Sequence, residues 1–185
     1  MGWQPGNLII LGARPSVGKT AFALNLARNA AVEFNEPVAF FSLEMTSMEL
    51  MDRLIATESG ISSDKLKGKL KLLPNEWQIL EQSAGRICKS PLYIDETPGI
   101  TLTEFVAKAK RLVREKGVKI IFVDYLQLMH SGKPQLGGFS KVQEVTEISN
   151  TLKTTAKELN IPIIALAQLN RNLMSRMGSN GKPVL

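Results

Sequence analysis

Cysteine and histidine are almost absent from this sequence of 185 residues, which contains only Cys88 and His130. A single cysteine cannot form a disulfide within the chain, so a disulfide-stabilised fold is excluded. With one histidine we expect neither an imidazole-based metal site nor a Ser-His triad within the chain. We expect Cys88, in the mostly apolar segment 84–88, to be buried as a small hydrophobic side chain.

Long apolar stretches are also missing from the sequence. No run approaches the roughly 18 residues that a membrane-spanning helix requires, and residues 1–6 lack the pattern of a signal peptide. We therefore expect a cytoplasmic protein without a membrane partner. The content of 44% hydrophobic and 22% charged residues is typical of one globular domain. A net charge of +6 favours polyanionic partners, although basic residues on solvated helix faces would give the same excess.

The sequence does contain a glycine-lysine-threonine segment in a distinctive context. Residues 8–11 are an apolar run that predicts a buried strand, and residues 21–27 have helical composition without a helix breaker. Between them lies the segment Ala13-Arg14-Pro15-Ser16-Val17-Gly18-Lys19-Thr20. A strand before it and a helix after it predict a phosphate-binding loop rather than a turn that merely opens a helix.

Three residues of this loop carry its chemistry. Gly18 lets backbone N–H groups approach a triphosphate, Lys19 supplies a cation for the β- and γ-phosphates, and Thr20 supplies a hydroxyl for Mg²⁺. The strict pattern of such loops has glycine where this chain has Ala13. Alanine still permits a tight loop in most backbone conformations, but it loses glycine's easy access to positive φ.

The rest of the sequence alternates strand and helix patterns, which predicts a mostly parallel sheet with helices on both faces. The strand at 119–124 is the most hydrophobic, so we expect it at the centre of the sheet. Two capping boxes, Thr46 with Glu49 and Thr101 with Glu104, mark helix starts. Further strands are expected at 37–43, 92–95 and 162–168, and further helices at 47–58, 62–70, 75–89, 101–116 and 141–159.

Polar residues lie at the ends of three predicted strands, namely Glu44, Asp124 and Gln168. Ligands of open parallel sheets bind beyond the carboxyl ends of the strands, where the phosphate loop also lies. Asp124 suits Mg²⁺ coordination, and Glu44 could orient and deprotonate an attacking water. The Gln168 side chain could form a hydrogen bond with the γ-phosphate and sense the loss of that phosphate. Each of these residues, taken alone, could instead be a helix cap or a loop anchor.

Four segments together resemble the ATPase domain of replicative DNA helicases of the DnaB type, a RecA-like fold. They are 13–20, Phe41-Ser42-Leu43-Glu44-Met45, Asp124-Tyr125-Leu126-Gln127-Leu128-Met129, and 156–160 through 168–171. The resemblance extends over essentially the whole chain, and the family itself carries alanine at the position of Ala13. It implies a single RecA-like P-loop NTPase domain over residues 1–185.

The resemblance also implies roles for the candidate residues. The loop 13–20 binds ATP, Thr20 and Asp124 bind Mg²⁺, Glu44 is the catalytic base, and Gln168 links the γ-phosphate to DNA-contacting loops. Such helicases are homo-hexameric rings with ATP sites between subunits, and they translocate on single-stranded DNA to unwind the duplex at the replication fork. A primase and a helicase loader are further implied partners.

Basic residues in two loop regions are candidate DNA-phosphate contacts. Family members present loops to the central channel after the strand that ends at Asp124 and again after Gln168. By that placement the candidates in this chain are Lys133, Lys141, Arg171 and Arg176. The alternative is that these residues belong to flexible, solvated loops.

The family pattern extends beyond this chain at both ends. Family members have an N-terminal domain and a linker helix, and after a segment like 182–185 they continue into further strands and a basic finger that enters the neighbouring subunit's site. We therefore expect a fragment of a larger protein. It should bind ATP and Mg²⁺ but hydrolyse ATP poorly by itself, because such a finger contributes on the order of 10³ to 10⁵ in turnover.

Two other functions are compatible with parts of the sequence. A RecA-like recombinase or a ring-forming signalling ATPase would share the fold without unwinding DNA, but segments 41–45 and 124–129 resemble helicases more closely. A nucleotide-dependent interaction module would not be an enzyme at all. The joint presence of four residues argues against that module, since binding without hydrolysis does not need all of them: Lys19, Thr20, Glu44 and Asp124.

Overall fold

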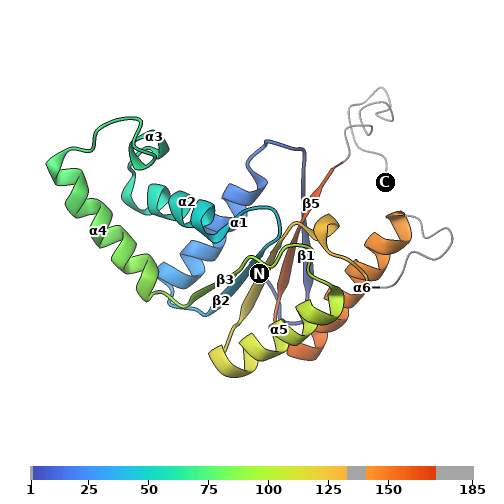
Figure 1. Cartoon of the computed structure of the whole chain (residues 1–185). Helices are drawn as coiled ribbons and strands as arrows, with labels where there is room; N and C mark the ends of the chain where they lie inside the picture. Colours follow the sequence, from blue (N-terminus) through green and yellow to red (C-terminus); the bar gives the residue numbers. More distant parts are fainter. Residues whose placement is uncertain (1, 133–140, 170–185) are drawn as a thin grey trace.

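A parallel sheet forms the centre of the structure, a computed structural model that describes residues 2–132 and 141–169. Its five strands are β1 (Leu8–Ala13), β2 (Val38–Ser42), β3 (Leu92–Asp95), β4 (Ile120–Asp124) and β5 (Ile163–Gln168). The spatial order β1-β5-β4-β2-β3 places β4 in the middle, as its hydrophobicity predicted (Figure 1). The parallel sheet with its helices confirms the predicted α/β class.

The helices begin and end close to the predicted positions. They are α1 (Lys19–Arg28) with the π-helical turn η1 (Asn29–Glu33), α2 (Ser47–Ser59), α3 (Ser63–Leu66), α4 (Pro74–Lys89), α5 (Leu102–Lys116), the 3₁₀ turn η2 (Leu126–Leu128) and α6 (Lys141–Leu159). Both predicted capping boxes form, at Thr46 and Thr101. The segment predicted at 62–70 is shorter than expected, because Gly68 takes a φ of 72° and ends the helical turn.

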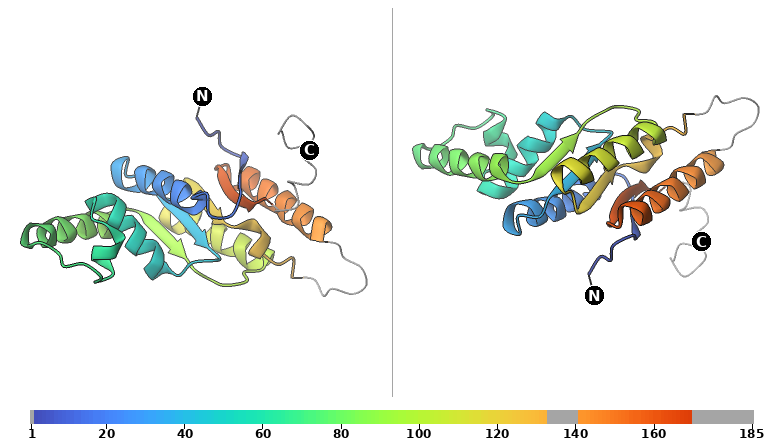
Figure 2. Two further views of the ribbon diagram at one scale, coloured as in Figure 1. Left: turned by 90° about the horizontal axis from the view of Figure 1, so that it is seen from above. Right: turned by 90° about the horizontal axis from the view of Figure 1, so that it is seen from below.

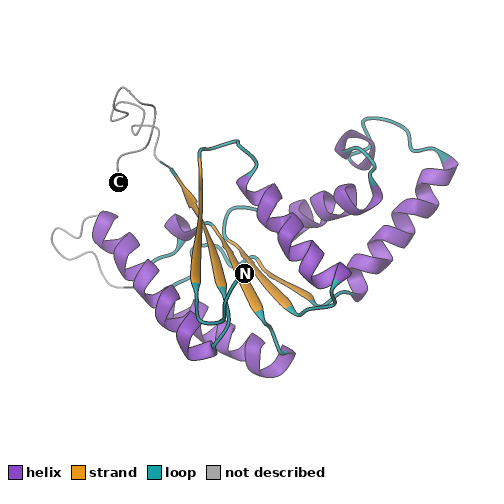
Figure 3. Ribbon diagram, turned by 180° about the vertical axis from the view of Figure 1, so that it is seen from behind, coloured by secondary structure: helices purple, strands orange, loops and turns teal. Residues whose placement is uncertain are grey.

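Alternate residues of each strand face opposite layers of helices. Phe40 and Phe122 pack under α1, α2 and α4, whereas Phe41 and Val123 pack against α5 and α6. Figures 2 and 3 show the sheet between these two layers. Because the helices cover the faces of the sheet, the carboxyl ends of the strands remain available for a site.

Two sequence predictions about burial are wrong. The first strand is not buried: β1 pairs only with β5 in the described residues, and Ile10 on this edge strand is 47% exposed. Cys88 is exposed, because α4 turns Ser83 and Ile87 toward the core and the next residue lies about 100° further round the helix. Among the described residues, no helix is long and apolar enough to span a membrane.

Candidate nucleotide-binding site

The segment between β1 and α1 is a loop with two residues at positive φ, Ser16 at 64° and Gly18 at 93°. Gly18 is the N-cap of α1, and its carbonyl accepts the first helical hydrogen bond from Phe22 N at 2.9 Å. Ala13 belongs to β1, where it pairs with Gln168 of β5. The alanine at the first position of the loop therefore needs no positive φ, and the departure from the glycine pattern carries no conformational cost here.

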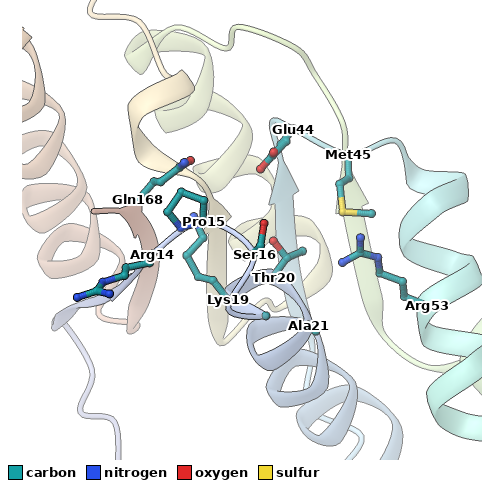
Figure 4. Close-up of a pocket in the computed structure, with 11 residues that line it drawn as sticks. Arg14, Pro15, Ser16, Lys19, Thr20, Ala21, Glu44, Met45, Arg53 and Gln168 are labelled. Atoms are coloured by element: carbon teal, nitrogen blue, oxygen red, sulfur yellow. The ribbon is translucent and has the colours of Figure 1, made fainter. Parts of the chain in front are cut away.

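A cavity of about 440 Å³ opens above this loop. Its lining includes Lys19 and Thr20 at the start of α1, Glu44 after β2, and Gln168 at the end of β5. Figure 4 shows Glu44 to one side of the loop and Gln168 to the other. The structure therefore brings together predicted site residues from three strand ends, at a helix N-terminus that favours anions.

Other residues of the predicted loop are divided between this cavity and a second one. Arg14, Pro15 and Ser16 line the first cavity, whereas Ala13 and Val17 line an adjoining cavity of about 490 Å³ beside α1. The loop thus turns its central residues toward the site and its first and fifth residues toward the edge of the sheet.

Asp124 lies beneath the loop at the end of β4, with 0% of its surface exposed. Its Oδ1 is 3.7 Å from the Lys19 ammonium nitrogen. Within the described part of the chain, neither of its carboxylate oxygens has a hydrogen-bond partner. A buried carboxylate without hydrogen bonds is costly to keep charged, which points to a ligand that would complete its environment.

Tyr125 gives Lys19 a second contact, because the ammonium lies 4.4 Å from the centre of the tyrosine ring. Burial raises the pKa of Tyr125, and the neighbouring charges of Glu44 and Asp124 raise it further. The phenol therefore stays neutral at physiological pH, and its ring offers the Lys19 ammonium an apolar, cation-binding surface. The lysine is held between a carboxylate and a ring, close to where phosphates would enter.

Glu44 is exposed at the tip of a short turn that the end of β2 anchors. Leu43 N donates to Asp124 O at 2.7 Å, so the backbone on one side of Glu44 is tied to β4. The buried Ser42 hydroxyl donates to Met45 O at 2.6 Å and accepts from Met45 N at 3.3 Å. These bonds fix the turn while leaving the Glu44 carboxylate at the cavity, where a water-activating base would be needed.

The donor set fits magnesium. Mg²⁺ favours one or two carboxylates together with phosphate oxygens and water, and Asp124 and the Thr20 hydroxyl offer such a set. No cluster of three or more His, Cys, Asp or Glu side chains with metal-binding geometry occurs in residues 2–132 and 141–169. Phosphate oxygens and water would complete the coordination of a metal that Asp124 and Thr20 begin to hold.

Arg53 was not among the residues predicted from sequence. It lies on α2 and lines the cavity, so it adds a cation on the same side as Glu44 (Figure 4). Nothing in the sequence distinguishes it from an ordinary surface arginine of an amphipathic helix. Ser42 and Tyr125 belong to segments 41–45 and 124–129, which resemble helicases, but no sequence pattern predicts the contacts of these two side chains.

The candidate DNA contacts remain outside what the structure describes. Lys133, Arg171 and Arg176 lie in segments 133–140 and 170–185, which are not among the described residues. Lys141 begins α6, but its side chain is not described. The DNA-contact hypothesis is therefore still a sequence-based prediction.

Comparisons with known proteins identify the family of the chain. The model of the DnaB-like helicase C terminal domain family matches residues 1–185. Replicative DNA helicase DnaB of Geobacillus stearothermophilus is 46% identical over 176 residues, which are 95% of this chain and 38% of that protein. Its counterpart from a Nostoc strain is 44% identical over 186 residues, 100% of this chain and 20% of that protein.

Two solved structures share the fold. A DnaB-like replicative helicase, studied with its interactions with primase, has a TM-score of 0.87 and 33% identity, covering 100% of this chain and 43% of that one. A second solved structure, of an ATPase domain, has a TM-score of 0.87 and 33% identity, covering 100% of this chain and 64% of that one. The chain therefore spans less than two thirds of the length of each of these relatives.

Proposed function

The chain belongs to the family of DnaB-like helicase C-terminal domains, and from this membership we propose that it is the ATPase unit of a replicative DNA helicase. In this proposal residues 1–185 form one RecA-like domain that binds and hydrolyses ATP. The observation that carries it is the convergence of Lys19, Glu44 and Gln168 on one cavity above the buried Asp124.

The proposed reaction assigns one task to each side chain. The loop backbone and Lys19 hold the β- and γ-phosphates, while Thr20 and Asp124 hold Mg²⁺. When bound, the metal neutralises charge that develops on the phosphate oxygens. Glu44 orients a water for attack on the γ-phosphorus and accepts its proton, while the bond from that phosphorus to the β,γ-bridging oxygen breaks and ADP leaves. The Gln168 carboxamide bonds the γ-phosphate and loses that partner when phosphate leaves.

The proposed partners follow from the family. We infer that the whole protein forms a homo-hexamer, translocates on single-stranded DNA in the cytoplasm, and meets a primase and a helicase loader. Primase is supported by one structural relative, which was studied with it. Contacts to DNA phosphates are proposed for Lys133, Lys141, Arg171 and Arg176, and a net charge of +6 is compatible with such a partner.

The match to a helicase family over the whole chain disfavours the two alternatives. A recombinase or a signalling ATPase would use the same cavity but would not unwind a forked duplex. A module without enzymatic activity would not need a base at the position of Glu44.

The test is ATP turnover by the whole protein, with and without single-stranded DNA, over a series of salt concentrations. We expect DNA to stimulate turnover and DNA binding to weaken with salt, with a log–log slope of about −0.7 per phosphate contact. Lys19→Ala and Glu44→Gln should both be inactive, with Glu44→Gln still binding ATP. Glu81→Gln, which changes an exposed carboxylate on α4, is the matched control. Turnover that ignores DNA, or an active Glu44→Gln variant, would contradict the proposal.

A further inference from the structure

Gln127 makes an unusual pair of contacts with the residue at the end of β5. Its side-chain Nε2 donates to Gln168 O at 3.0 Å, and its Oε1 accepts from Gln168 N at 3.3 Å. One carboxamide therefore satisfies both backbone groups of Gln168, in the way that a neighbouring strand would.

This contact replaces strand pairing that is missing at the ends of β4 and β5. The two strands pair only from Ile121 with Ile163 to Val123 with Ala165, because the chain after Asp124 leaves the sheet and forms η2. On its other side, β5 stays paired as far as Gln168, which lies opposite Ala13. The last residues of β5 would thus lack a partner on the β4 side, and Gln127 in η2 supplies one.

We propose that Gln127 is a positioning residue for the nucleotide site: it holds the backbone of Gln168 so that the Gln168 side chain stays at the cavity. This inference rests on the function proposed above, in which Gln168 bonds the γ-phosphate. Gln127 itself is not among the residues that line the cavity, so it acts through Gln168 rather than on the nucleotide.

The same contact ties together two segments that the site uses. Gln127 lies three residues after Asp124, which faces Lys19, and Gln168 lies opposite the start of the phosphate loop. Loss of the two hydrogen bonds would free the end of β5 without removing any group that holds the phosphates. Displacement of a reacting or positioning group by about 1 Å can lower turnover by up to about 10²-fold.

The experiment uses Gln127→Ala and Gln127→Glu in the whole protein, with ATP turnover and ATP binding measured separately. Gln127→Glu keeps the size and an acceptor for Gln168 N, but it loses the donor and turns an oxygen toward Gln168 O. We expect kcat to fall by about 10- to 100-fold in both variants, with ATP affinity within about 3-fold of the native value. Gln82→Ala, an exposed glutamine on α4, should leave both quantities unchanged.

A double variant separates positioning from a general structural effect. If Gln127 acts through Gln168, then Gln127→Ala combined with Gln168→Ala should be no slower than Gln168→Ala alone. Multiplied losses in the double variant would overturn the inference, as would full kcat in Gln127→Glu. If Gln168→Ala lowers turnover while neither Gln127 variant does, only this inference fails. If Gln168→Ala itself keeps full turnover, the role proposed for Gln168 is wrong and the inference falls with it.

Discussion

Two buried carboxylates in this protein have opposite surroundings. The Glu58 side chain lies between α1, α2 and α4 and is 1% exposed. Each of its carboxylate oxygens forms an ion pair with an arginine. Arg28 Nε lies 2.6 Å from its Oε2 and Arg86 Nη1 lies 2.6 Å from its Oε1. Asp124 is buried to the same degree, but in the described residues it has only the Lys19 ammonium at 3.7 Å.

The difference shows how burial serves stability in one region and chemistry in the other. A buried charge that is fully paired holds elements together, and removal of one partner leaves an uncompensated charge. A buried carboxylate whose oxygens make no hydrogen bonds contributes little to the stability of the fold, but these oxygens can bind a cation. We therefore propose that Glu58 serves the packing of the helical layer and that Asp124 serves the candidate nucleotide site.

The largest effect expected from this comparison is on catalysis at Asp124. Asp124→Asn should lower ATP turnover by about 10³-fold or more, because the charge that helps to hold Mg²⁺ is lost. The free energy of unfolding of Asp124→Asn should not fall below that of the native protein, because the substitution removes a buried charge. Chelation of Mg²⁺ should abolish turnover of the native protein. Steady-state ATPase assays and urea denaturation measure the two quantities, and a strongly destabilised Asp124→Asn variant would contradict the assignment.

The converse effect is expected on stability at Glu58. Arg28→Ala should lower the free energy of unfolding by about 3 kcal/mol, because Glu58 then keeps only one arginine. ATP affinity should stay within about 3-fold of the native value. Arg111→Ala removes an exposed arginine of α5 as a control and should change stability by less than about 0.5 kcal/mol. If Arg28→Ala were as stable as the control, the Glu58 cluster would not contribute to the fold.

Ligand binding should distinguish the two regions more finely. At a concentration of 100 times its Kd, Mg-ATP should raise the free energy of unfolding of the native protein by about 2.7 kcal/mol. Arg28→Ala should show the same increment from its lower baseline, whereas Asp124→Asn should show little or none at the same concentration. Thermal or chemical denaturation with and without nucleotide gives these increments. If all three proteins showed equal increments, Asp124 would not take part in binding Mg-ATP.

The smallest effect concerns an exposed carboxylate. Hydrogen bonds from the backbone and side chain of Thr101 lower the pKa of Glu104 at the start of α5. A carboxyl group with a lowered pKa in the folded state contributes stability above its unfolded pKa and loses it as the pH falls through the folded pKa. Denaturation curves between about pH 6 and pH 3 should show a smaller loss in Glu104→Gln than in the native protein. An identical pH dependence would refute this contribution.

The sequence predicted which residues gather at the candidate site better than it predicted the contacts that support them. Lys19, Glu44 and Asp124 could be identified because parallel strands end at one edge, so strand-end polar residues meet there. Glu58 with Arg28 and Arg86 could not, because these residues lie on three helices whose relative packing decides which side chains meet.

Local signals were sufficient for most helix ends but not for every side chain. The capping boxes at Thr46 and Thr101 were predictable because their bonds join residues three apart. The contact of Gln127 with Gln168 spans 41 residues and depends on how the chain leaves the sheet to form η2. No sequence pattern therefore predicts it. Cys88 was misjudged because the apolar composition around it does not reveal which face of α4 is buried.

The most direct test of the central claim is the Mg²⁺ dependence of ATP binding in native protein and in Asp124→Asn. Titration calorimetry would give the affinity for ATP with Mg²⁺ and with a chelator. We predict that Mg²⁺ tightens binding to the native protein by at least about 10-fold, or about 1.4 kcal/mol, and that this gain is largely lost in Asp124→Asn. If the variant kept the full Mg²⁺ dependence, the buried carboxylate of Asp124 would not serve the metal, and the assignment of this region to nucleotide chemistry would be wrong.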